Sequence, residues 1–169
     1  MKSAKKIILS GIFTALLIGG QLALSGISGL EVVTVLLLTF AYRYGIAQGL
    51  FVANSFSLLR CFIFGFMPNV LVLYLVYYNI FVLVFGVVGN IFKHEYSIKK
   101  HIIIILIAVI MTVLFTVIDN VLTPLIYAFT PNAAKAYFTA SLYTVVPQII
   151  CTFVTVLIIF PILLRVLKD

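Results

Sequence analysis

Three ionisable residues lie in or against apolar stretches of the sequence: Glu31, Arg60 and Asp119. The chain is 64% hydrophobic and has only four Asp and Glu residues, so two of its four acids stand where lipid would penalise them. A charge at the centre of a membrane helix costs roughly 2.5–3.5 kcal/mol on insertion scales, which makes such residues candidates for a functional site. Carboxylate and guanidinium groups in these positions are suited to binding the polar or charged ends of a ligand.

The sequence around these residues is that of an integral membrane protein. Only 9% of its 169 residues are charged, whereas about a quarter of a soluble domain is charged. Its mean hydropathy is +1.32. We expect one all-α membrane domain over residues 1–169, because a helix satisfies its own backbone polar groups in lipid. The net charge of +7 is explained by basic residues that flank the apolar runs, and no nucleic acid partner is expected.

Six transmembrane helices in a compact bundle are predicted from the apolar runs, which are separated by Gly, Pro and short polar segments. The expected spans are residues 7–24, 30–41, 46–64, 70–92, 102–122 and 142–164. The second is short. Pro124 is expected to end the fifth, because proline interrupts helical hydrogen bonding, and a connection over residues 125–139 precedes the sixth.

The distribution of Lys and Arg predicts the orientation of the chain. With six spans both termini lie on one side, and nine of the 11 Lys and Arg residues fall there, leaving only Arg60 and Lys135 on the other. Both termini are therefore expected to be cytoplasmic. Glu31, Arg60 and Asp119 would then share one depth in the outer third of the bilayer, where opposite charges can pair. A cleaved signal peptide over about residues 1–25 is the alternative, and it would leave five spans.

Other polar side chains recur at helical spacing near these charges. Thr112, Thr116, Asp119 and Thr123 share one face of the fifth span, and Thr144, Gln148, Thr152 and Thr155 share one face of the sixth. Such faces would enclose a polar pocket that is open to the outside and has aromatic walls. The predicted substrate-binding residues are Glu31, Arg60, Tyr74, Tyr78, Asn79, Asp119 and Gln148.

Structural interpretations of the same residues stay open at this point. Threonines in membrane helices commonly bond to their own backbone. Tyrosines near the membrane interface often form an aromatic belt. A carboxylate and Arg60 would form a buried salt bridge that only holds helices together.

Small residues recur every four positions on the first span, at Gly11, Ala15 and Gly19. A stripe of this kind gives a flat face on which another helix can pack closely. The stripe predicts docking of a partner protein, with packing inside the bundle as the alternative.

Motifs for common catalytic chemistry are not found in the sequence. It has no phosphate-binding Gly-rich loop followed by Lys, so ATP hydrolysis is not expected. It has no HExxH or GxSxG motif and no Cys or His cluster at metal spacing. We expect no enzymatic activity, no catalytic residues, no cofactor and no bound metal.

The chain resembles the substrate-binding S components of energy-coupling factor (ECF) vitamin transporters. The resemblance rests on the basic start before the first span, the stripe of Gly11, Ala15 and Gly19, residues 29–34 with Glu31, residues 60–69, and the tyrosines of the fourth span. It covers essentially the whole chain, but its motifs are loose. In that family the stripe is typically Ala-x-x-x-Ala, and Gly replaces Ala here at two positions.

The resemblance implies a function and a set of partners. S components bind a vitamin or related micronutrient from outside a bacterial cell membrane. They dock through the first helix to a membrane coupling subunit, which is driven by two cytoplasmic ATPases. The expected function is thus a high-affinity binding subunit for uptake of a vitamin-like micronutrient. The alternatives are a stand-alone small-molecule transporter or channel, a membrane enzyme, and a structural bundle with a buried salt bridge.

Overall fold

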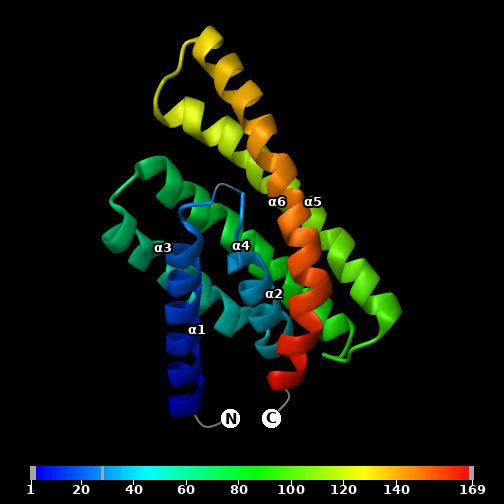
Figure 1. Cartoon of the computed structure of the whole chain (residues 1–169). Coiled ribbons are helices and arrows are strands. Elements are labelled where there is room, and N and C mark those ends of the chain that lie inside the picture. Colours follow the sequence, from blue (N-terminus) through cyan, green and yellow to red (C-terminus); the bar gives the residue numbers. More distant parts are fainter. Residues whose placement is uncertain (1–2, 28, 168–169) are drawn as a thin grey trace.

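The computed structural model describes residues 3–27 and 29–167, which form six helices and no strand (Figure 1). The helices are α1 (Ser3–Leu24), α2 (Val33–Tyr44), α3 (Ile46–Phe64), α4 (Pro68–Ile91), α5 (Ile98–Ile126) and α6 (Pro131–Val166). The prediction of an all-helical chain is therefore confirmed. Five of the helices, all except α2, are long and apolar enough to cross a membrane, as expected of a multi-pass membrane protein.

The short helix α2 lies in the middle of the bundle and packs against α1, α3, α4 and α6. Nine of its 12 residues are buried, which explains why it is apolar on all sides. At about 1.5 Å per residue it is about 18 Å long, well short of a hydrocarbon core of about 30 Å. Helix α2 therefore begins inside the bundle, and the residues just before it are held at that depth.

The far end of α2 is tied to the end of the bundle where α1 begins and α6 ends (Figure 1). The Arg43 side chain donates from Nε to the carbonyl of Leu167 at 3.1 Å. The Tyr42 hydroxyl donates to the carbonyl of Glu95 at 2.8 Å, in the loop between α4 and α5. Gly89 of α4 packs against the main chain of Tyr42 so closely that a Cβ there would overlap its carbonyl. These contacts fix the axial position of α2, and with it the position of its N-terminal end.

Helices α5 and α6 form a long hairpin that extends past the other helices at the opposite end (Figure 1). Helix α5 does not end at Pro124 as predicted but continues to Ile126, because the turn after it supplies hydrogen bonds to the carbonyls of Thr123, Pro124 and Leu125. Helix α6 begins at Pro131, well before the predicted residue 142. Proline is favoured at this first helical position, and the Thr130 side chain caps the helix by accepting from the Ala133 amide at 3.3 Å.

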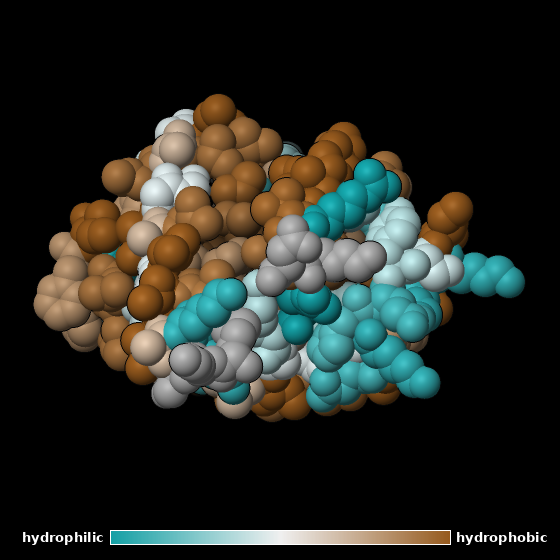
Figure 2. All heavy atoms as spheres, turned by 90° about the horizontal axis from the view of Figure 1, so that it is seen from below, coloured by the Kyte–Doolittle hydropathy of each residue, from teal (hydrophilic) through white to brown (hydrophobic). Residues whose placement is uncertain are grey.

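The start of α1 and the end of α6 lie at the same end of the bundle (Figure 1). Figure 2 views the molecule from that end, where hydrophilic residues gather on one part of the face and hydrophobic residues cover the rest. An ion pair joins Lys100 Nζ to Glu95 Oε2 here at 3.0 Å. Hydrogen bonding to Lys100 and its positive charge hold the pKa of the exposed Glu95 carboxyl below its usual value.

Candidate functional site

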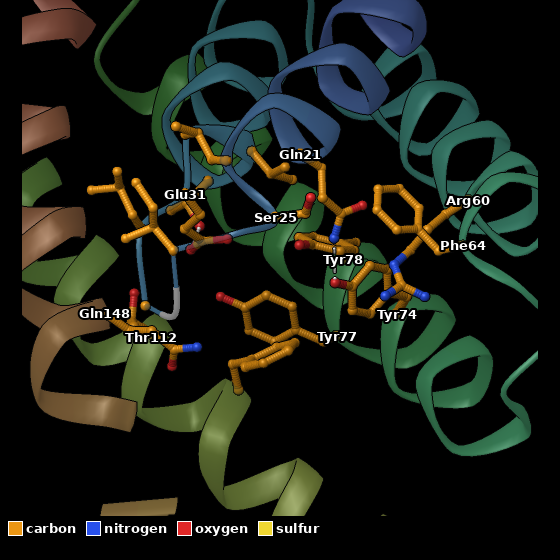
Figure 3. A pocket seen from close by; sticks show the side chains of 17 residues that line it. Gln21, Ser25, Glu31, Arg60, Phe64, Tyr74, Tyr77, Tyr78, Thr112 and Gln148 are labelled. Atoms are coloured by element: carbon orange, nitrogen blue, oxygen red, sulfur yellow. Dashed lines mark hydrogen bonds between the residues drawn. The ribbon is translucent and has the colours of Figure 1, made fainter. Parts of the chain in front are cut away.

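A cavity of about 350 Å³ is lined by residues of all six helices and of the segment that precedes α2 (Figure 3). Because Gln21 and Ser25 stand at the end of α1 away from its start, the cavity is in the half of the bundle opposite the start of α1 and the end of α6. The polar and aromatic residues that line it are Gln21, Ser25, Glu31, Thr34, Arg60, Phe64, Tyr74, Tyr77, Tyr78, Thr112, Phe115 and Gln148. A site of this size with few polar groups and aromatic walls suits a small organic molecule.

One wall is formed by residues 29–32, which we call the strap. Gly29 has a φ angle of +81°, and a Cβ on it would stand 2.6 Å from Cβ of Pro147 in α6. Only glycine combines this backbone angle with so close an approach. Two residues later, the Glu31 amide donates to Cys151 Sγ at 3.3 Å and the Cys151 thiol donates to the Glu31 carbonyl at 3.2 Å. The strap is thus held against α6 at two points, four residues apart on that helix.

This anchoring directs the Glu31 side chain into the cavity (Figure 3). Thr34, in the first turn of α2, donates to Glu31 Oε1 at 2.5 Å. Oε2 has no hydrogen-bond partner among the described residues. One oxygen of the carboxylate is therefore held by the protein, and the other faces the cavity and can accept a hydrogen bond.

Arg60, near the end of α3, lies on the other side of the cavity from Glu31 in Figure 3. Its guanidinium carbon stands 4.8 Å from the ring centroid of Tyr74 and 5.1 Å from that of Phe64, within the range of cation–π attraction. Its Nε is buried and has no hydrogen-bond partner among the described residues. The aromatic rings hold the plane of the guanidinium in place and leave a donor unsatisfied.

The expected pairing of Arg60 with an acid is not found. Within residues 3–27 and 29–167 the structure contains one ion pair, between Lys100 and Glu95, and it lies outside the cavity. Arg60 is stacked on aromatic rings, and the Glu31 carboxylate accepts a hydrogen bond from Thr34. The cavity therefore contains an acidic and a basic side chain that do not form an ion pair with each other.

Aromatic residues form the surface between these two groups. Tyr74, Tyr77 and Tyr78 of α4 are buried and touch one another edge to face, with ring centroids 4.9 Å apart for Tyr74 and Tyr78. Tyr77 also packs edge to face against Phe115 of α5 at 4.9 Å. Gln21 donates from Nε2 to the Tyr74 hydroxyl at 2.8 Å, and the oxygen of its amide is buried without a partner. The wall is therefore aromatic, with its rings at steep angles to one another.

The polar faces predicted on α5 and α6 do meet. The hydroxyl groups of Thr112 and Thr152 lie within hydrogen-bond distance of each other, at 2.9 Å. Thr112 and Gln148 line the cavity beside the strap (Figure 3). Thr152 is buried at this junction. These side chains join the two helices and complete the cavity on the side away from Arg60.

Five of the seven predicted substrate-binding residues line this one cavity: Glu31, Arg60, Tyr74, Tyr78 and Gln148. Asp119 does not. It shares a helix face with Thr112 but lies seven residues further along α5, about 10 Å toward the hairpin turn. Its carboxylate accepts hydrogen bonds from Thr123 and from the Tyr137 hydroxyl, both at 2.7 Å.

Asn79 also lies outside the cavity lining. It is adjacent to Tyr78 in sequence, but successive residues of a helix point in different directions. Its amide pairs reciprocally with that of Asn54 in α3, through two hydrogen bonds of 3.1 Å. This pair joins α3 to α4, and neither residue lines the cavity.

Several lining residues were not among the predicted site residues. Tyr77 is three residues from Tyr74 on the same helix face, so its spacing was a usable signal. Thr34 and Phe115 carry no such signal, because their role depends on how α2 and α5 are placed. Gln21 lies in the last turn of α1 and Ser25 follows that helix, and both line the cavity because of where α1 stands in the bundle.

Comparisons of the chain with protein-family models, with curated proteins and with solved structures found no match.

Proposed function

We propose that this protein is a membrane-embedded binding subunit for uptake of a small, vitamin-like micronutrient, working with an ATP-driven ECF energising module. The observation that carries the proposal is the presence of Glu31 and Arg60 in one cavity without an ion pair between them. In the proposed orientation, both termini are in the cytoplasm of a bacterial cell and the cavity opens toward the outside.

Unpaired charges at membrane depth favour ligand binding over a structural role. Burying a charge is costly unless it is paired and hydrogen-bonded, so a purely structural bundle would bring Glu31 and Arg60 together. Here the two residues are held in place separately. Glu31 is bonded to Thr34 and Cys151, and Arg60 is stacked on aromatic rings. Such preorganisation lowers the cost of binding a ligand that supplies the missing partners.

The outer surface of α1 supports the proposed partnership with a membrane coupling subunit. Gly11, Ala15 and Gly19 are all exposed, and a Cβ added to either glycine would meet no atom within 4 Å. The stripe is therefore not covered by another described part of this chain, which favours docking over packing inside the bundle. The neighbouring Ser10 and Thr14 are buried and face inward. A flat, small-residue face on the outside of a membrane helix suits close packing of another helix.

Native mass spectrometry of the purified chain tests the proposed binding function. A small molecule should co-purify with the wild-type chain and be lost from Arg60→Ala, while the variant still inserts in the membrane. Unchanged retention of that molecule by Arg60→Ala would contradict the assignment of the cavity.

An uptake assay then separates the subunit from a stand-alone transporter. The identified molecule should accumulate only in cells that also contain an ECF energising module. Efficient accumulation by the chain alone in liposomes would show that it transports independently.

A further inference from the structure

We propose that the ligand of this cavity is a zwitterion, with a positively charged nitrogen for Glu31, an anionic oxygen group for Arg60, and a flat apolar body between them. This inference rests on the proposed binding function and specifies its substrate class. It follows from the contents of the cavity, which are a carboxylate with one oxygen unbonded, a guanidinium that is not paired with it, and aromatic walls.

Glu31 defines the acidic end of the cavity. Thr34 donates to its Oε1 and Cys151 holds its main chain, so the carboxylate cannot turn away without losing the bond to Thr34. Oε2 has no partner among the described residues. Among residues 3–27 and 29–167, no Lys or Arg other than Arg60 lines the cavity. An ammonium or amidinium group of the ligand would supply both the charge and the hydrogen bond that Glu31 lacks.

Arg60 defines the basic end. Its guanidinium lines the cavity and lies over Tyr74 and Phe64, and it forms no ion pair with a described acid. A planar guanidinium presents several N–H groups in a geometry that matches the two oxygens of a carboxylate or a phosphate. Among the described residues, Glu31 is the only acid that lines the cavity, and it does not pair with Arg60. The ligand is therefore the available source of an anion.

The space between these ends limits the size and shape of the ligand. A volume of about 350 Å³ is equivalent to roughly a dozen water-sized groups. The tyrosine rings of α4 line this space at steep angles to one another, with 85° between the ring planes of Tyr74 and Tyr78. A planar apolar body would pack against the face of one ring and the edge of the next.

Three single-ring probes separate the contributions of the two charges. They are 4-(aminomethyl)benzoate, which carries both charges, benzylamine, which carries only the positive one, and 4-methylbenzoate, which carries only the negative one. The longer zwitterion 4-(2-aminoethyl)benzoate tests for a different spacing of the ends. Because Cys61 is partly buried and Cys151 is buried, a thiol-reactive fluorescent dye reports thermal unfolding of the full chain in detergent. The shift of the midpoint with probe concentration gives an apparent Kd.

We expect at least one zwitterion to bind the wild-type chain about 10- to 100-fold more tightly than either single-charge probe, as is usual for a hydrogen bond to a charged group. In Glu31→Gln, the zwitterion should bind no more tightly than 4-methylbenzoate. In Arg60→Gln, it should bind no more tightly than benzylamine. Glu95→Gln and Arg165→Gln are matched controls outside the cavity and should keep both advantages.

Equal binding of a single-charge probe, or no binding of either zwitterion, would overturn the inference. This comparison uses the wild-type chain, so it does not depend on the folding of any variant. A co-purified ligand with a single charge would likewise overturn the inference, yet leave the proposed binding function intact. Conversely, tight zwitterion binding without module-dependent uptake would contradict the proposed function and leave the inference intact.

Discussion

The main chain of Glu31 and the thiol of Cys151 are joined by hydrogen bonds in both directions, at 3.3 Å from the amide and 3.2 Å to the carbonyl. The two residues are 120 positions apart in the sequence. This contact connects α6 to the strap and sets the direction in which the Glu31 carboxylate points. The acidic end of the cavity is therefore built by α6 as much as by the residues around Glu31.

Cys151→Ala should destabilise the protein and weaken ligand binding. It leaves the amide and carbonyl of Glu31 without partners in an apolar setting, which costs about 1–3 kcal/mol. Cys151→Ser keeps a donor and an acceptor and should be milder. Thermal unfolding followed by circular dichroism measures the loss.

Cys61→Ala provides the matched control for this change. The Cys61 thiol donates only to Ser57 in its own helix, at 3.5 Å, and it does not line the cavity. If Cys61→Ala loses as much stability as Cys151→Ala, the contact between Cys151 and the strap does not stabilise the protein more than an ordinary thiol bond within a helix.

Gly29→Ala should displace the strap from α6. Alanine at a φ of +81° costs about 1–2 kcal/mol, and its Cβ would also collide with Pro147, 2.6 Å away. Gly65→Ala is the control, because Gly65 has a φ of +89° and no atom within 4 Å of an added Cβ. The difference in unfolding free energy between the two variants isolates the contact with Pro147. If the two variants lose equal stability, close packing of the strap on α6 is refuted.

Asp119→Asn should lower thermal stability and leave ligand affinity within about twofold. Asp119 accepts from Tyr137 in α6 and from Thr123, which in turn accepts from Asn69 at the start of α4 at 3.2 Å. Removing a hydrogen bond to a charged group from such a partly buried set costs about 1–3 kcal/mol. Tyr137→Phe removes one of the same bonds and should act in the same direction. A large drop in affinity with normal stability would instead return Asp119 to the set of ligand-binding residues.

The sequence was informative where a residue's environment depends on its own helix. The all-helical fold and the bounds of α3 follow from the apolar runs, and Tyr74 and Tyr78 follow from helical spacing along α4. Glu31 and Arg60 were identified because charges are rare in apolar runs. In each case, local composition or periodicity carries the information.

The remaining features depend on contacts between segments that are distant in sequence. The central position of α2 requires four other helices around it, and the strap requires Pro147 and Cys151 of α6. Asp119 lies two helical turns from Thr112, which lines the cavity. Helical spacing shows that the two residues share a face, but it does not show how far along that face the cavity extends. The stacking of Arg60 on Tyr74, in place of an ion pair, likewise depends on how α3 meets α4.

The exposed stripe on α1 gives a prediction that separates binding from transport. Gly11→Leu combined with Ala15→Leu places two large side chains on a face where no other helix of this chain packs. The cavity is lined from the opposite end of α1, so ligand affinity should stay within about twofold of wild type. Uptake by cells containing the energising module should fall at least tenfold, because close helix packing needs small residues. The matched control is Ala136→Leu with Ala140→Leu, an exposed pair of the same spacing on α6, which should transport normally. Normal uptake by the α1 variant, or equal loss in the α6 control, would rule out the stripe as the docking face.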